Sequence, residues 1–106
     1  MTIRIKTISA CVRLATCKIM MSEQYISIAL INNGSCFDHA RCVVSIARKY
    51  KIKGVSLRSG PGHVWIEYNK KCFDAEHNRG VGHPRLLNYY KRDWRNRRKL
   101  PAIKRK

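Results

Sequence analysis

The strongest constraint on the fold of this chain is an amphipathic segment in its middle, at residues 36–50. Apolar side chains recur there at the spacing that places them on one face of an α-helix of about four turns. The face consists of Cys36, Ala40, Val43, Ala47 and Tyr50, and Phe37 and Val44 widen it. Such a face must be covered, so the segment predicts one central helix packed on a second layer.

The start of this helix has a capping signature. Ser35 stands at the N-cap, and Asp38 follows three residues later, which is the acidic form of a capping box. The pattern predicts that the Ser35 side chain satisfies a free backbone N–H group of the first turn.

A strand pattern follows the helix. Residues 63–68 alternate in polarity, and a tight connection at 69–71 leads to a returning strand at 72–75. A further strand is predicted at 55–58, after the glycine that ends the helix. The order of these segments predicts an α+β fold in which a helix packs on a small antiparallel sheet.

The remaining segments carry weaker patterns. Residues 1–20 form an uncertain lead-in with a short strand at 3–6, and residues 22–31 favour a short helix. A glycine-rich loop is expected at 78–84. The 106 residues fit a single domain, with residues 85–106 as a basic C-terminal segment.

The charge of the chain is extreme. Lysine and arginine total 23 against six acids, a formal net charge of +17. Such a field attracts nucleic acid, anionic lipid or an acidic protein. In the C-terminal segment we expect a helix that begins at Pro84, with Leu87, Tyr90 and Trp94 on the sheet. The outward basic side chains are candidate contacts for a nucleic acid or another polyanion: Arg92, Arg95, Arg97, Arg98 and Lys99.

Five cysteines without a CxxC pair favour a reducing compartment, so we expect an intracellular, cytoplasmic protein, with export as a weaker alternative. No apolar stretch approaches the ~20 residues of a membrane-spanning helix. The spacing of the other cysteines and histidines supports no tight metal-ligand pair, so no metal site is predicted. The residues considered are His39, Cys42, Cys72, His77 and His83.

Cys36 is the first candidate for chemistry. It occupies the first position of the predicted helix, where free N–H groups and the helix dipole stabilise a thiolate and lower its pKa. The same N–H groups can hold an oxyanion. The competing interpretation is a small buried side chain on the apolar face, which is the commoner fate of a free cysteine.

His63 and Asp74 are the next candidates. His63 opens a strand directly after a Gly-Pro-Gly turn, and an imidazole there could take the Cys36 proton. A turn at 69–70 places Glu76 opposite His63 and Asp74 diagonal to it; a turn one residue earlier places Asp74 opposite. Either register lets Asp74 orient the imidazole. The competing interpretation of His63 is a half-buried structural histidine in a strand. That of Asp74 is a carboxylate that only offsets local positive charge.

The ordered set of these residues resembles the transglutaminase-like branch of the papain-like superfamily. The pattern is G-x-C-x-x-x-A on a helix, H-x-W-x-E on a strand and an aromatic-Asp pair on the next strand. It falls on Gly34, Cys36 and Ala40, then on His63, Trp65 and Glu67, then on Phe73 and Asp74.

The resemblance implies a papain-like fold with Cys36 as nucleophile, His63 as general base and Asp74 as its orienting partner. It implies a hydrolase or acyltransferase that attacks a peptide or side-chain amide through a thioester, without a cofactor. The oxyanion donor remains open between Gln24 and Asn33, with Tyr25 and Asn32 as further candidates.

Two other functions stay open. The chain could be a non-catalytic binding protein with the same fold, which binds nucleic acid or an acidic partner through its basic face. It could also be a dedicated nucleic-acid-binding protein, in which case its affinity should fall steeply with salt.

Overall fold

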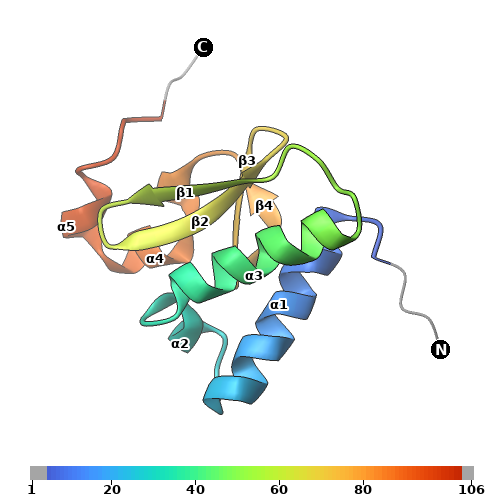
Figure 1. The fold of residues 1–106 in the computed structure, drawn as a ribbon. Coiled ribbons are helices and arrows are strands. Elements are labelled where there is room, and N and C mark those ends of the chain that lie inside the picture. The colour runs from blue at the N-terminus through green and yellow to red at the C-terminus, as the bar shows by residue number, and fades with distance from the viewer. Residues whose placement is uncertain (1–4, 104–106) are drawn as a thin grey trace.

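The computed structural model describes residues 5–103. A four-stranded antiparallel sheet is combined with helices in an α+β fold (Figure 1). In chain order the elements are α1 (Ile8–Glu23), α2 (Ala29–Asn32), α3 (Cys36–Lys49), β1 (Ser56–Gly60), β2 (His63–Tyr68), β3 (Lys71–Asp74), β4 (His77–Val81), the 3₁₀ turn η1 (Pro84–Leu86), α4 (Asn88–Arg92) and α5 (Trp94–Arg97). Within residues 5–103, no helix has the length and apolar character needed to cross a bilayer.

The sheet is a simple meander in which each strand pairs with its neighbour in sequence, in the order β1-β2-β3-β4. The pairing of Tyr68 with Lys71 leaves a two-residue turn at Asn69 and Lys70, which have φ values of 51° and 64°. Two positive φ angles are the signature of a type I′ hairpin turn, whose twist matches that of the strands. The predicted hairpin is confirmed, in the register set by a turn at 69–70.

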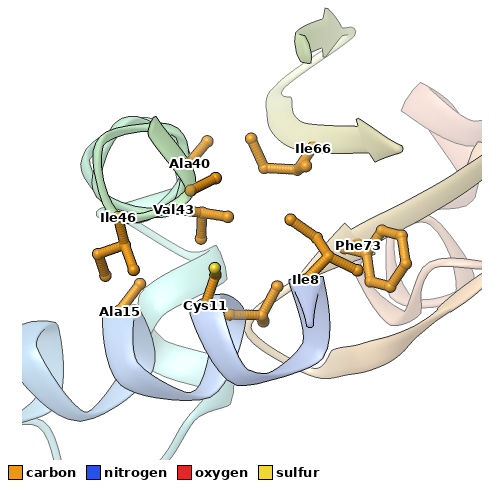
Figure 2. Close-up of a cluster of buried hydrophobic side chains, with 10 residues drawn as sticks. Ile8, Cys11, Ala15, Ala40, Val43, Ile46, Ile66 and Phe73 are labelled. Atoms are coloured by element: carbon orange, nitrogen blue, oxygen red, sulfur yellow. The ribbon is translucent and has the colours of Figure 1, made fainter. Parts of the chain in front are cut away.

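The central helix is confirmed at Cys36–Lys49, and its apolar face packs between α1 and the sheet. Val43 is fully buried and Ala40 is 1 % exposed. Figure 2 shows these side chains meeting Ile66 from β2 and Ile8 from α1. Small residues on α3 allow the neighbouring elements to approach closely, which is how a short chain fills its core.

The N-terminal segment differs from the prediction. Instead of a lead-in followed by a helix at 22–31, a long helix runs from Ile8 to Glu23, and only a single turn, α2, forms later. Cys11, Val12 and Ala15 of α1 are fully buried in the core. The strand predicted at 3–6 lies mostly outside the described residues, and residues 5 and 6 are not in a strand.

The segment that follows β4 covers the second face of the sheet. Trp65 and Cys72 on this face pack with Leu87 and Tyr90 from the segment beyond β4. The predicted loop at 78–84 is largely wrong, because residues 77–81 form strand β4.

The predicted last helix is also wrong in part. It is divided into η1, α4 and α5, and Trp94 begins α5 with its side chain 60 % exposed instead of docked on the sheet. The chain bends at Asp93, whose side chain caps α5 by accepting a bond from the Asn96 N–H at 3.1 Å.

Candidate active site

Cys36 is the first residue of α3 and is half-buried. Ser35 precedes it at the N-cap, but its side chain makes no capping bond; its Oγ instead shares a hydrogen bond of 2.7 Å with the Tyr25 hydroxyl. The predicted capping box is therefore wrong. The first N–H groups of α3 remain free of side-chain caps, and that of Phe37 helps to stabilise the thiolate.

The pKa of Cys36 lies below its ordinary value. The largest cause is the interaction of the thiol with His63, and the backbone N–H groups of Val64 and Phe37 add to it; partial burial opposes them. The shift favours the thiolate, which is the nucleophilic form of cysteine. Cys11, Cys42 and Cys72 show the opposite behaviour, because burial raises each of their pKa values, that of Cys72 to about 11.

His63 begins β2 and is 2 % exposed. Its ring stacks on Tyr89 with centroids 4.5 Å apart and an angle of 13°, and Tyr90 meets it edge-on. Its Nε2 lies 3.0 Å from Asp74 Oδ2. The other nitrogen, Nδ1, is buried and has no hydrogen-bond partner among the described residues, and the Cys36 thiol is one of the groups that raise the pKa of the ring.

The pKa of His63 is raised despite its burial. Burial alone would lower it, but the hydrogen bonds and charges of Asp74 and Cys36 outweigh that effect. A lowered thiol pKa beside a raised imidazole pKa favours a thiolate–imidazolium pair.

Asp74 ends β3 and is 2 % exposed. Its Oδ2 faces His63, while its Oδ1 accepts a hydrogen bond of 3.0 Å from the backbone N–H of Glu76. Both carboxylate oxygens are thus held in place, which fixes the imidazole in one orientation. The diagonal placement matches one of the two registers that the sequence left open.

The turn between β1 and β2 is locked against α4. The Tyr90 hydroxyl donates to the Pro61 carbonyl at 3.0 Å. Gly62 has a φ of 71°, and any side chain there would collide with the Tyr89 hydroxyl and with the Asn96 amide. Glycine is therefore needed at this position both for its backbone conformation and for the close approach of Tyr89.

A cleft of about 610 Å³ opens beside the thiol. Its walls come from the loop before α3, from the β1–β2 turn and from the α4–α5 segment, which lie at the same end of the molecule (Figure 1). The lining residues are Asn32, Asn33, Gly34, Cys36, Gly62, Tyr89, Arg92, Asp93, Trp94 and Arg95.

The two oxyanion candidates are placed differently. Asn33 is exposed and lines the cleft, whereas Gln24 is exposed at the end of α1 and is not among the lining residues. Of the further candidates, Asn32 is engaged, because its Nδ2 donates to Glu76 at 2.8 Å, and Tyr25 bonds Ser35. The structure thus leaves Asn33 and the N-terminal N–H groups of α3 at the cleft.

Glu76 helps to hold the candidate site together, although the sequence assigned it no role. It accepts hydrogen bonds from Asn32 and Asn88 and a bidentate pair from Arg92, at 2.9 and 2.6 Å. The pKa of Glu76 is lowered to about 2, mainly by the Arg92 guanidinium. Through Asn32 and Arg92, this carboxylate connects the end of α2 to α4 and so shapes the cleft. Its sequence signal was the hairpin register with a turn at 69–70, which places it opposite His63.

The predicted polyanion contacts fall into two groups. Arg92 is bound to Glu76, and Arg97 Nε donates to the Arg85 carbonyl at 3.3 Å. The other three, Arg95, Arg98 and Lys99, are exposed, and none of them forms an ion pair within the described residues.

The metal candidates do not gather. His39 is 2 % exposed between α3 and α1, where its Nε2 lies 2.9 Å from the Thr16 hydroxyl, so it neither faces solvent nor lines the cleft. Thr16 donates its own proton to the Val12 carbonyl, so His39 donates to Thr16. No three His, Cys, Asp or Glu side chains of residues 5–103 are arranged to hold a metal ion.

Comparison with known proteins adds no relative to this picture. No family model matches the chain, and no curated protein and no solved structure is significantly similar to it. The arrangement of Cys36, His63 and Asp74 is therefore the feature of the molecule that points to a function.

Proposed function

We propose that this protein is a cysteine-dependent hydrolase or acyltransferase of the transglutaminase-like type, acting on a peptide or side-chain amide. The observation that carries the proposal is the buried His63, held by Asp74 at 3.0 Å and lowering the pKa of the Cys36 thiol. A structural histidine would need neither a fixed carboxylate behind it nor a reactive thiol in front of it.

In the proposed reaction, the Cys36 thiolate attacks the carbonyl carbon of the amide. The oxyanion that forms lies near the free N–H groups at the start of α3, with the Asn33 side chain at the same cleft. The His63 imidazolium gives its proton to the leaving amine, and a thioester to Cys36 remains. Water, or an amine in a transferase, then attacks the thioester carbonyl while His63 accepts its proton. The C–S bond breaks, which releases the acid or the new amide and returns the Cys36 thiolate.

The arrangement of elements supports this type of fold as part of the proposal. A helix with the nucleophile at its first residue packs on an antiparallel sheet, and consecutive strands supply the base and the orienting carboxylate. These are the places that the papain-like resemblance assigns to the three residues.

The test is to capture the acyl-enzyme. The protein is incubated with a protein digest and hydroxylamine, which cleaves thioesters, and hydroxamates are counted by mass spectrometry. We expect hydroxamates with the native protein and none with the folded Cys36→Ala variant. Equal yields from the two proteins would contradict the proposal.

The second candidate function is a non-catalytic binding protein on this fold. It is favoured by the net charge of +17 and by the exposed cations Arg95, Arg98 and Lys99, which no acid in the described residues neutralises. A Cys36→Ala variant that keeps full biological activity would favour it, whereas loss of activity without loss of fold would favour the enzyme.

A further inference from the structure

The charged side chains of the cleft do not contribute equally to its potential. Three of the lining residues are charged: Arg92, Asp93 and Arg95. The Arg92 guanidinium is neutralised by Glu76. The Asp93 carboxylate is directed into its own helix, where it accepts the Asn96 N–H and side-chain amide at 3.1 and 3.0 Å. Arg95 is the lining cation that is left for a ligand.

The wall that carries Arg95 has an unusual aromatic residue. Trp94 is 60 % exposed although it lines the cleft, and two guanidinium groups lie over its ring. Those of Arg95 and Arg98 are 5.7 and 5.1 Å from the ring centroid. A large apolar ring beside two unpaired cations offers both a contact surface and two carboxylate-binding forks.

We propose that this wall binds an acidic peptide segment, whose glutamate or aspartate side chains pair with Arg95 and Arg98 while its chain lies across Trp94. The proposal rests on the proposed function, because it places the attacked amide of that peptide beside Cys36. An arginine fork binds a carboxylate through two parallel hydrogen bonds, so the pairing selects carboxylate-bearing sequences over amide-bearing ones.

A peptide fits the cleft better than a single-stranded nucleic acid. Strand binding without sequence preference uses successive aromatic platforms, one for each stacked base. Of the aromatic residues that line this cleft, Tyr89 already stacks on His63, so Trp94 is the ring that remains open. The single open ring of Trp94, beside Arg95 and Arg98, suits one peptide residue whose neighbours in the peptide carry carboxylates.

Binding can be measured apart from catalysis, in the full chain carrying Cys36→Ala. The probes are a fluorescein-labelled peptide with alternating glutamate and glycine, its glutamine counterpart, and a labelled oligo-dT. By fluorescence anisotropy we expect about tenfold tighter binding of the glutamate peptide than of the glutamine peptide. Arg95→Gln should remove most of this preference, whereas Lys53→Gln, the same loss of charge in the segment between α3 and β1 and away from the cleft, should leave it nearly unchanged.

The position of the peptide is tested in the native protein by alkylation of Cys36 with iodoacetamide. Tryptic peptide 19–41 contains Cys36 as its single cysteine, and peptide 14–18 contains Cys17, which is exposed and serves as the internal control. The glutamate peptide should slow alkylation of Cys36 and leave that of Cys17 unchanged.

Equal affinity for the glutamate and glutamine peptides, or the absence of protection of Cys36 by the glutamate peptide, would overturn the inference. So would oligo-dT that protects Cys36 at lower concentration than the peptide. A fast reaction of Cys36 without peptide selectivity would leave the proposed function standing.

Discussion

The two faces of the sheet are covered in different ways. The face toward α1 and α3 is an apolar layer, where Ile66 and Phe73 from the sheet meet Ile8 and Val43 from the helices (Figure 2). The other face, covered by the C-terminal segment, is aromatic and polar. It carries His63 and Asp74, which are both buried, together with Trp65, Tyr90 and the stacked Tyr89.

Strand alternation produces this division. In β2 the even-numbered residues Val64 and Ile66 enter the aliphatic core, and the odd-numbered residues His63 and Trp65 enter the second layer. A slip of one residue would exchange the two sets, so the well-packed core on one face fixes the position of the imidazole on the other. The comparison predicts that substitutions on the two faces damage different properties.

The largest effect is expected for His63→Ala. Without the imidazole, the pKa of Cys36 should return toward its ordinary value, and the rate of iodoacetamide labelling near pH 6.5 should fall by about 10²-fold. The rate is measured on peptide 19–41, with Cys17 in the same molecule as the reference. Asp74→Asn should cause a smaller loss, because the imidazole remains but is less well oriented. Unchanged labelling of a folded His63→Ala protein would remove the basis for a reactive pair.

The next largest effect concerns stability, on the aliphatic face. Ile66 is 1 % exposed, so Ile66→Ala should lower the free energy of unfolding by about 2–5 kcal/mol, and the control Ile66→Val by about 0.5–1.5 kcal/mol. Urea unfolding measures both. At temperatures where the variant remains folded, Cys36 should label at nearly the native rate. A large loss of reactivity in the folded protein would show that the two faces are not separable.

Glu76→Gln should have an intermediate effect of about 1–3 kcal/mol at neutral pH, because it breaks a partly buried charge-assisted network. The pKa of this carboxylate is about 2 in the folded protein, against an ordinary value of 4.5. A lowered carboxyl pKa stabilises the fold above pH 4.5, and that contribution is lost as pH falls from 4.5 toward 2. Native stability should therefore decline through this window more steeply than that of the variant, as measured by urea unfolding at several pH values. Parallel curves would contradict the role of Glu76.

The smallest effect is expected for Phe37→Ser. Phe37 is next to the nucleophile in sequence, but its ring is 49 % exposed and it does not line the cleft. The free energy of unfolding should change by no more than about 0.5 kcal/mol, and labelling of Cys36 should be unaffected. A marked change in either would mean that the face around Phe37 takes part in the site.

The parts of the fold that the sequence predicted are those specified by local patterns. Helix α3 has a regular apolar stripe, β2 is rich in β-branched and aromatic residues, and Asn69 suits the positive φ of its turn. Helix α1 was missed because its buried side chains are small, among them Cys11 and Ala15, and because Arg13 interrupts them in sequence although it points outward in the helix.

Strand β4 was missed for a non-local reason. It contains Gly80, whose φ is 82° and whose hydrogen side faces the Phe73 ring so closely that a Cβ would lie 2.7 Å from it. In a sequence, a glycine indicates a loop. The reason for a glycine at this position of a strand is the close Phe73 ring on the neighbouring strand, which the sequence alone does not show.

The candidate site shows the same division. The placing of Cys36, His63 and Asp74 could be predicted because a helix start and one hairpin determine it. The contributions of Tyr89 and Glu76 could not, because they depend on α4 folding back over the β1–β2 turn. No local spacing encodes that contact.

The enclosure of His63 by Tyr89 and Tyr90 has a consequence for biosynthesis. Both tyrosines follow the helix and the hairpin that carry the thiol and the imidazole, so they emerge later from the ribosome. A nascent chain therefore leaves its imidazole exposed to water until residues 89 and 90 have emerged, and the buried pair is complete only after α4 has folded back over the hairpin.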